Sequence, residues 1–254
     1  MRQTAALPWP KTRGPNSGSV VKNGGRVIDR APTEDVMVSR KIIGTNQQFQ
    51  IGKIICLARN YAEHAKELGN ETPTAPVLFM KPASSVIGDG DTTVIPAYSQ
   101  ECHYEVELAV LIGSEARSVT VDSALEHVAG YGVAIDMTLR DIQNQLKAKG
   151  LPWDIAKGYD TACPLSDFVP ASAVADPHTL SLKLAVNGEL RQDGCSSDMI
   201  NRIPQIIAHI SAIFTLEAGD VILTGTPAGV GRVQPGDIMA ADIASVGQLT
   251  IPVA

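Results

Sequence analysis

The sequence predicts an α+β fold in which strands outnumber helices and form a mixed or antiparallel β-sheet. Three observations support this prediction. The 254 residues include 22 glycines and 16 prolines, which favour turns between many short elements. Asn187-Gly188 follows a stretch of alternating hydrophobicity and is the strongest short signal for a β-hairpin. No strand–helix–strand unit recurs at a regular interval, which disfavours a doubly wound parallel sheet.

The first predicted elements are a strand and a short helix. An apolar run over residues 54–57 predicts the strand, and the helix follows over residues 60–68. Gly69 is well suited to end it. The apolar residues that share one stripe of this helix are Tyr61, Ala65 and Leu68.

Two more apolar strands come next. One covers residues 108–112, and the other, "VAGYGVAID", ends on the carboxylate of Asp136. A second helix is predicted directly after Asp136, with Gly150 at its end. Its apolar positions at helical spacing are Leu139, Ile142 and Leu146.

The C-terminal third is predicted to contain a hairpin, a helix and a closing strand. Leu182, Leu184 and Val186 alternate before Asn187-Gly188, as the half-buried strand of a hairpin should. Pro204 is acceptable in the first turn of a helix over residues 203–214. Isoleucines at helical spacing in this segment are Ile203, Ile206, Ile207, Ile210 and Ile213. "LEAGDVILTGTPAGVG" then places a strand between tight turns.

Composition excludes several classes of protein. Hydrophobic residues make up 44% of the chain and charged residues 19%, which is ordinary for a globular protein. Every apolar run is far shorter than the roughly 18 residues that a membrane span requires. The cysteines Cys56, Cys102, Cys163 and Cys195 form no pair or cluster at zinc-ligand spacing. We therefore expect free thiols and a cytoplasmic location.

Charge is distributed unevenly along the chain. Residues 1–30 carry six basic side chains and one acidic one, whereas the remainder carries 15 basic and 26 acidic side chains. Such an acidic body would repel a polyanion, so no nucleic-acid partner is expected. The proline- and glycine-containing residues 1–36 predict a flexible or loosely docked arm, and residues 37–254 the catalytic domain. Organellar targeting by this basic arm is the alternative to a mere extension.

Two glutamates precede the strand over residues 108–112. In extended backbone Glu105 and Glu107 point to the same face, about 7 Å apart at their Cα atoms. Two carboxylates held together in a partly buried site need a shared proton or a cation between them. The alternative is a solvated strand edge carrying two surface glutamates.

Asp136 adds a third carboxylate at a strand end. A carboxylate that ends an apolar strand needs a partner, because burial of an unpaired charge is costly. Carboxylates without histidine or cysteine nearby suit a hard divalent cation such as Mg²⁺ or Mn²⁺. Asp136 could instead cap the helix that follows it.

Several motifs in order resemble the fumarylacetoacetate hydrolase superfamily, in particular its small acylpyruvate hydrolase and oxaloacetate decarboxylase branch. They extend from about residue 53 to residue 254. The segments are "ARNYAEHAKELG", "APVLFMKP", "HYEVELAVLIG", "IDMTLRDIQ", "GLPWDIAKGYDTACPLSDFVP", "VNGELRQDG" and "TLEAGDVILTGTPAGVG". The resemblance implies a mixed β-sheet roll with a few short helices, usually dimeric or larger, and we expect a homodimer.

The resemblance also implies roles for individual residues. Glu105, Glu107 and Asp136 match the metal ligands for Mg²⁺ or Mn²⁺. His64 and Glu67, three apart on one helix face, match a pair that activates water. Lys157 matches a lysine that would stabilise an enolate.

Four further positions match residues that contact the substrate. These are Arg59, Arg140, Gln143 and Thr226, the last of them in the "TGTP" turn. Arg140 would suit a carboxylate through its forked donors. Two positions depart from the family pattern: Ala58 replaces a glycine before "RNY", and Tyr104 replaces a histidine.

The resemblance, together with these residues, implies a metal-dependent hydrolase that cleaves acylpyruvate-type β-dicarbonyl acids to pyruvate and a carboxylic acid. The same enolate would arise in decarboxylation or tautomerisation of oxaloacetate, so those activities remain open. Two alternatives are kept. One is an isomerase or decarboxylase of aromatic breakdown, acting on 2-hydroxyhepta-2,4-diene-1,7-dioate or 5-oxopent-3-ene-1,2,5-tricarboxylate. The other is a module that binds a metal and a keto acid without turnover.

Overall fold

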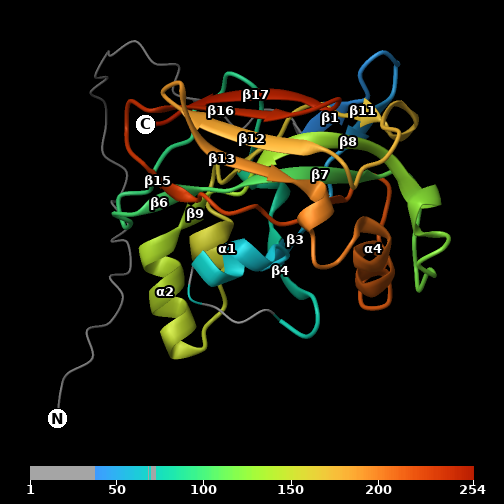
Figure 1. The fold of residues 1–254 in the computed structure, drawn as a ribbon, viewed down its shortest axis with the longest axis horizontal. Helices are drawn as coiled ribbons and strands as arrows, with labels where there is room; N and C mark the ends of the chain where they lie inside the picture. The colour runs from blue at the N-terminus through green and yellow to red at the C-terminus, as the bar shows by residue number, and fades with distance from the viewer. Residues whose placement is uncertain (1–37, 68, 70–72) are drawn as a thin grey trace, which may run out of the picture. The chain divides into compact units, whose positions relative to one another are not determined.

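The computed structural model describes residues 38–67, 69 and 73–254. The predicted arm over residues 1–36 lies outside the described residues, and so does Leu68 of the predicted helical stripe. In the described part of the chain strands outnumber helices, and the helices are short (Figure 1).

The largest sheet has six strands and mixed direction. Its strand order is β11 (Val169–Pro170), β8 (Val128–Ile135), β7 (Val106–Ile112), β14 (Val221–Leu223), β3 (Ile54–Ala58) and β4 (Val77–Lys81). β14 and β3 are parallel, and the other neighbouring pairs are antiparallel. The predicted strands over residues 54–57 and 108–112 are both central members of this sheet.

A four-stranded antiparallel sheet covers one face of the six-stranded sheet. Its order is β13 (Glu189–Cys195), β12 (Ser181–Val186), β16 (Ile238–Ile243) and β17 (Gly247–Pro252). Leu108 and Val110 of β7 lie in one hydrophobic cluster with Leu182 and Leu184 of β12 and with Met239 of β16. The main core therefore lies between the two sheets (Figure 1).

The hairpin prediction is confirmed. β12 and β13 are antiparallel neighbours, and Asn187 and Gly188 between them have φ angles of 52° and 81°. Positive φ at both central residues is the requirement of a type I′ turn. Leu182, Leu184 and Val186 are buried, as their alternation predicted.

Smaller sheets complete the described chain. A three-stranded sheet has the order β15 (Gly231–Val233), β6 (Cys102–Tyr104) and β9 (Thr138–Leu139). Two-stranded pairs are β1 (Ser39–Lys41) with β2 (Gln48–Gln50) and β10 (Cys163–Pro164) with β5 (Val86–Ile87). Short 3₁₀ turns lie at Ala83–Ser85, Ala124–His127, Ala171–Ala173 and Ser196–Asp198.

The described α-helices are α1 (Ala62–Glu67), α2 (Arg140–Lys149), α3 (Asp154–Lys157) and α4 (Ile203–Ser211). Two predictions about them were wrong in part. Leu139 belongs to β9, because β6 pairs with it there, so α2 begins at Arg140. Ile213 is 57% exposed, because α4 ends at Ser211 before the last position of the predicted stripe. Gly150 ends α2 in the left-handed conformation, as predicted.

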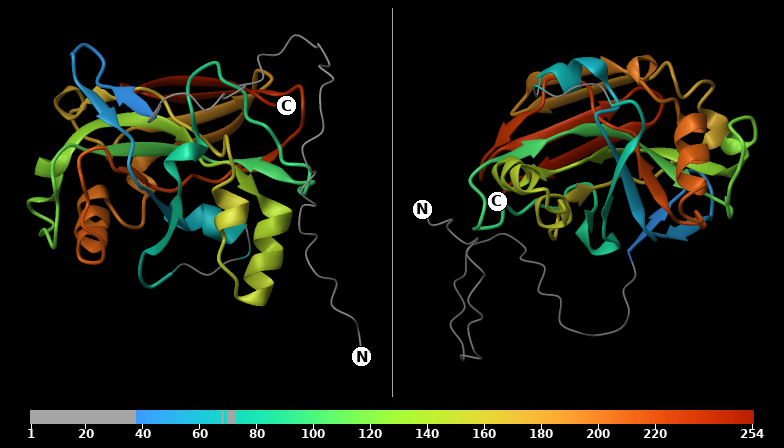
Figure 2. Two further views of the ribbon diagram at one scale, coloured as in Figure 1. Left: turned by 180° about the vertical axis from the view of Figure 1, so that it is seen from behind. Right: turned by 90° about the horizontal axis from the view of Figure 1, so that it is seen from below.

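β7 is buried on both faces, and this places the candidate site. Leu108 and Val110 face the four-stranded sheet, whereas Ala109 and Leu111 belong to a second hydrophobic cluster. Glu107 shares the face of Ala109 and Leu111, because side chains alternate along a strand. α1 and α2 lie side by side below β7 in Figure 1 and again in the rear view of Figure 2.

Candidate active site

Three buried carboxylates meet where β7 begins and β8 ends. Val106 of β7 is opposite Ile135 of β8, so Glu105 lies beside Asp136, whose N–H donates to the Glu105 carbonyl at 2.8 Å. Glu105, Glu107 and Asp136 each offer one oxygen within 4.8 Å of the other two. Their exposed fractions are 4%, 1% and 1%. The antiparallel register thus brings together acids that are about 30 positions apart in the sequence.

Lys157 and Arg140 lie against this cluster. Lys157 Nζ is 2.6 Å from Asp136 Oδ2 and 2.9 Å from Glu105 Oε2, and it is held there by the short helix α3. Arg140, the first residue of α2, donates to the other oxygen of Glu105. Arg140 also donates to Gln143 Oε1 at 2.7 Å, one turn further along α2. The structure therefore brings five of the predicted site residues into direct contact.

Lys81 is a buried cation that the sequence interpretation missed. Its Nζ lies 2.7 Å from Asp136 Oδ1. It also donates to the backbone carbonyls of Met137 at 3.2 Å and Ala162 at 2.9 Å, and to that of Lys157. A charged residue at the end of the apolar segment "VLFM" is the same signal that identified Asp136, so the sequence contained it.

The cluster shifts the ionisation of its members. Burial alone would raise the pKa of Glu105, but Lys157 and Arg140 outweigh it and hold that pKa well below its usual range. Burial, with the charges of Asp136 and Glu105, raises the pKa of Glu107 well above its usual range. Glu107 therefore lacks the charge compensation that Glu105 has.

The donor set fits a divalent cation. Within the described chain no lysine, arginine or histidine forms an ion pair with Glu107, whose carboxylate accepts one hydrogen bond, from Gly225 N at 2.6 Å. Asp136 Oδ1 is buried and accepts no hydrogen bond from any described residue, although Lys81 lies beside it. Anionic oxygens without nitrogen or sulfur ligands are what Mg²⁺ and Mn²⁺ prefer. A cation beside Glu107 would remove the repulsion among the three acids.

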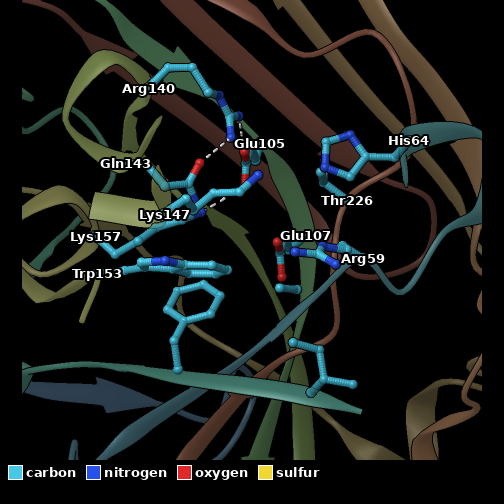
Figure 3. A pocket seen from close by; sticks show the side chains of 13 residues that line it. Arg59, His64, Glu105, Glu107, Arg140, Gln143, Lys147, Trp153, Lys157 and Thr226 are labelled. Atoms are coloured by element: carbon cyan, nitrogen blue, oxygen red, sulfur yellow. Dashed lines mark hydrogen bonds and ion pairs between the residues drawn. The ribbon is translucent and has the colours of Figure 1, made fainter. Parts of the chain in front are cut away.

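A pocket opens directly over Glu105 and Glu107 (Figure 3). Phe79 and Trp153 form an aromatic wall, with ring centroids 5.9 Å apart, and Lys157 Nζ lies 4.7 Å from the Phe79 ring centroid. The side chains that line the pocket include every predicted site residue except Asp136 and Glu67. Asp136 touches the lining through Lys157.

His64 and Glu67 lie one turn apart on α1. His64 Nδ1 is 3.6 Å from Glu67 Oε2, too long for a hydrogen bond, and this nitrogen has no hydrogen-bond partner in the described structure. Both oxygens of Glu67 instead accept the backbone N–H of Gly229, at 3.1 and 3.2 Å. Burial lowers the pKa of His64, so its imidazole is neutral at neutral pH and can accept a proton.

Arg59 and Thr226 border the pocket from two further segments. Arg59 follows β3 with a φ of 60°, an uncommon conformation for a residue other than glycine, and its side chain lines the pocket. Thr226 is 2% exposed and follows Gly225, whose φ of 91° turns the chain away from β14. Lys147 of α2, which the sequence interpretation did not single out, also lines the pocket.

The segment of residues 53–254 matches the family model described as "Fumarylacetoacetate (FAA) hydrolase C-terminal". The chain belongs to the fumarylacetoacetate hydrolase family. The resemblance drawn from the motifs is thereby confirmed, and with it the expectation of an enzyme of this family.

Relatives in the family share close to half of their residues with this chain. Oxaloacetate tautomerase FAHD1, mitochondrial, of Bos taurus is 49% identical over 193 residues, which are 76% of this chain and 87% of the relative. Its Arabidopsis thaliana counterpart is 50% identical over 201 residues, 79% of this chain and 90% of the relative. Oxaloacetate tautomerase YcgM of Escherichia coli is 48% identical over 195 residues, 76% and 89% of the two chains.

Solved structures of the family share the fold. Fumarylpyruvate hydrolase from Pseudomonas aeruginosa, in complex with Mn²⁺ and pyruvate, superposes with a TM-score of 0.83 at 36% identity, covering 87% of this chain and 97% of that one. The predicted β-rich mixed-sheet fold with few short helices is confirmed by this similarity and by the strand order described above.

Proposed function

We propose that this enzyme binds Mg²⁺ or Mn²⁺ at Glu105, Glu107 and Asp136 and interconverts the keto and enol forms of oxaloacetate or a closely related 2-keto acid. The observation that carries the proposal is the cluster of three buried carboxylates beside a pocket. Lys157 and Arg140 line the same pocket. Relatives about half identical to this chain carry the name oxaloacetate tautomerase, which supports this choice of substrate.

The net charge of the site favours a substrate that carries at least two negative charges during the reaction. Lys81, Lys157 and Arg140 form ion pairs with Asp136 and Glu105. With Glu107 counted as the third carboxylate, the cluster has three negative and three positive charges. A bound divalent cation would supply Lewis-acid polarisation of the substrate and leave two positive charges in surplus. A carboxylate together with an enolate oxygen would neutralise that surplus.

The protein's own residues would divide the remaining work. Lys157, with its charge fixed by two carboxylates, would stabilise negative charge developing on the substrate oxygen. Among the described residues, Arg140 donates three of its five N–H groups to His103, Gln143 and Glu105, and two are left for a carboxylate. Neutral His64 would take the proton from the substrate's methylene carbon as the enolate forms, and the enolate oxygen would then take up a proton to give the enol. In the reverse direction the oxygen would lose its proton and His64 would return one to the carbon.

Arg59 and Lys147 favour a second carboxylate on the substrate. Both line the pocket, and the pKa of Lys147 is lowered by partial burial and by the nearby charges of Arg59 and Arg140. An anionic group at this end of the pocket would relieve the repulsion among these cations. Oxaloacetate has such a second carboxylate, and acetylpyruvate does not. Arg59→Gln should therefore raise the KM for oxaloacetate more than the KM for acetylpyruvate.

The test of the proposed function is an assay of keto–enol exchange. Purified full-length protein with Mn²⁺ should accelerate the approach of enol-oxaloacetate to equilibrium, followed by the enol absorbance, and a chelator should abolish the effect. Pyruvate release would be measured in the same samples to separate tautomerisation from decarboxylation. Wild-type protein that binds Mn²⁺ but accelerates neither process would contradict the proposal.

Hydrolysis of acylpyruvates is the second candidate, favoured by the position of His64 beside the pocket with Glu67 next to it. In this reaction His64 would deprotonate a water that attacks the distal carbonyl. The C–C bond then breaks, and pyruvate leaves as its enolate and takes up a proton. Acetylpyruvate turnover that is lost in His64→Ala, with Mn²⁺ affinity retained, would support it. Full hydrolysis by His64→Ala would contradict it.

The same purified protein can test the two alternatives predicted from the sequence, the isomerase or decarboxylase of aromatic breakdown and the binding module without turnover. A 5-carboxymethyl-2-hydroxymuconate delta-isomerase from Mycobacterium smegmatis is 36% identical with a TM-score of 0.73, so isomerisation of dienedioates belongs in the substrate panel. A module that only binds would retain Mn²⁺ and keto acid but turn over no member of that panel.

Assembly and location are further proposals. A homodimer, a cytoplasmic location and the absence of nucleic-acid partners are the sequence predictions, and mass measurement by light scattering would test the first. Within the described residues, no helix is both long and apolar enough to cross a membrane. Several relatives carry "mitochondrial" in their names, which supports the targeting alternative for residues 1–36. Imaging of fluorescent fusions with and without these residues would decide between the two locations.

A further inference from the structure

A buried glutamine that the sequence interpretation passed over connects two parts of the pocket. Gln192 of β13 has an exposed fraction of 0%. Its Oε1 accepts the backbone N–H of Val106 at 3.0 Å. Its Nε2 donates to Thr226 Oγ1 at 2.8 Å and to the Pro227 carbonyl at 2.9 Å. One side chain therefore touches both the strand that carries the acids and the turn that carries Thr226.

The path of β14 explains why a side chain is needed there. β14 pairs with β7 up to Leu223, which lies opposite Ala109, and Gly225 then turns the chain away. Val106 lies three residues before Ala109, and no strand of the described chain pairs with it on this edge. A buried N–H without an acceptor is costly, and the Gln192 carbonyl replaces the missing strand.

The contact with Val106 fixes the orientation of the Gln192 amide. A backbone N–H can only donate, so the atom that faces Val106 is Oε1 and the atom that faces Thr226 is Nε2. The two hydrogens of that NH₂ group go to Thr226 Oγ1 and to the Pro227 carbonyl. The Gln192 amide therefore has no acceptor left on the side of Thr226.

This orientation determines what the Thr226 hydroxyl can do. Its oxygen accepts from Gln192, and no described residue accepts a hydrogen bond from it. Thr226 is 2% exposed and lines the pocket, so its hydrogen is available to whatever the pocket binds. At this point the pocket therefore selects a group that accepts hydrogen bonds, as a carboxylate does.

We propose that Gln192 is a positioning residue that makes Thr226 a hydrogen-bond donor to a carboxylate oxygen of the substrate. The proposal rests on the proposed function in one respect, the keto-acid nature of the substrate. Gln192 itself touches neither substrate nor cation, and it acts through the hydroxyl of Thr226.

The test is a double-mutant cycle measured by binding. Oxalate, which resembles the pyruvate enolate, would be titrated calorimetrically into Mn²⁺-loaded full-length wild type, Gln192→Met, Thr226→Val and the double variant. We expect each single substitution to weaken oxalate about tenfold, or 1.4 kcal/mol. Gln192→Met should weaken it less than about twofold in the Thr226→Val background, because the hydroxyl is then already absent. Mn²⁺ affinity should stay the same in all four proteins.

Several outcomes would overturn the proposal. One is an equal effect of Gln192→Met in both backgrounds, and another is unchanged oxalate affinity. A third is a parallel loss of Mn²⁺ affinity, which would mean that Gln192 only supports the strand of the acids. Gln192→Glu keeps the acceptor for Val106 and removes the NH₂ group, so it replaces the methionine variant in the same cycle if that variant does not fold.

A matched control separates loss of a buried hydrogen bond from loss of positioning. Ser166 is also buried, and its hydroxyl accepts the Val133 N–H at 2.9 Å, away from the pocket lining. Ser166→Ala should lower the unfolding temperature and leave oxalate affinity unchanged. Absence of keto–enol activity in the wild type would contradict the proposed function, whereas the oxalate cycle would still decide the role of Gln192.

Discussion

The carboxylate of Glu67 accepts the backbone N–H of Gly229 at 3.1 and 3.2 Å, although the two residues are 162 positions apart in the sequence. This contact joins the last residue of α1 to the loop that follows Thr226. Gly229 is suited to the position, because its φ is 96° and a Cβ there would lie 2.3 Å from the Arg191 carbonyl. Glu67 thus has a structural contact in addition to its predicted role beside His64.

Substitution of Glu67 can separate these two roles. Glu67→Gln retains an acceptor for the Gly229 N–H but loses the charge that would stabilise a protonated His64. We expect it to keep the wild-type unfolding temperature and to lose acylpyruvate hydrolysis by at least about tenfold. Glu67→Ala should lose both hydrolysis and thermal stability. If the glutamine variant hydrolyses acetylpyruvate at the wild-type rate, the charge of Glu67 has no part in the reaction.

Removal of Lys157 should affect metal binding and turnover in opposite directions. Lys157→Met leaves Asp136 and Glu105 with less positive charge nearby, so Mn²⁺ should bind at least as tightly as in the wild type. Turnover should fall by about 100- to 1,000-fold, because the group that stabilises the enolate is lost. Calorimetry with Mn²⁺ and the keto–enol assay on the same preparation would measure both. A variant that loses Mn²⁺ and activity together would show that Lys157 serves the metal site instead.

Lys81 should be essential for stability. Its ammonium is fully buried and is held by Asp136 and by three carbonyl groups, so Lys81→Met would leave these groups without their cation. Loss of one partner of a buried pair costs about 3–5 kcal/mol. Urea unfolding would measure this loss. Lys66→Met is the control, because Lys66 pairs with Glu63 at 3.8 Å with both side chains 79% exposed, and it should change nothing measurable.

His178 should make stability depend on pH. Its Nε2 accepts the Ile203 N–H at 3.2 Å at the start of α4, and burial lowers its pKa in spite of the opposing effect of Asp176. The unfolded chain therefore takes up a proton first as the pH falls below about 6.5. Stability from this group is present above that pH and declines as the pH falls toward the lowered pKa of the folded state.

The variant His178→Gln isolates this contribution. Glutamine keeps an acceptor for the Ile203 N–H but does not titrate. Between pH 7 and pH 5 the unfolding temperature of the wild type should fall further than that of the variant. Equal declines in the two proteins would show that His178 does not contribute to the pH dependence.

Local patterns in the sequence were sufficient to predict the features that depend only on neighbouring residues. Asn187-Gly188 forms the predicted hairpin because its turn type requires residues that tolerate positive φ. Glu105, Glu107 and Asp136 converge as predicted, because strand alternation and a charge at a strand end are both local signals. The limits of α2 and α4 were missed because strand pairing at Leu139 and exposure of Ile213 depend on residues elsewhere in the chain.

The parts of the site that were missed depend on tertiary contacts. Gln192 lies in a hairpin strand whose sequence looks like that of an ordinary surface hairpin. Its contact with Val106 is needed only because β14 diverges from β7 there. The contact of Glu67 with Gly229 likewise spans most of the chain. Lys81 differs, because a lysine at the end of an apolar strand could have been recognised by the rule applied to Asp136.

The surroundings of Lys81 resemble those of a monovalent metal ion more than those of an ordinary lysine. Carbonyl groups from the residue before β9, from α3 and from the segment before β10 converge on its ammonium, as carbonyl groups converge on potassium in proteins that require that ion. This cation is covalently attached to β4, so it cannot exchange with the medium. The inner wall of the pocket should consequently keep its shape whichever alkali cation predominates in the surrounding solution.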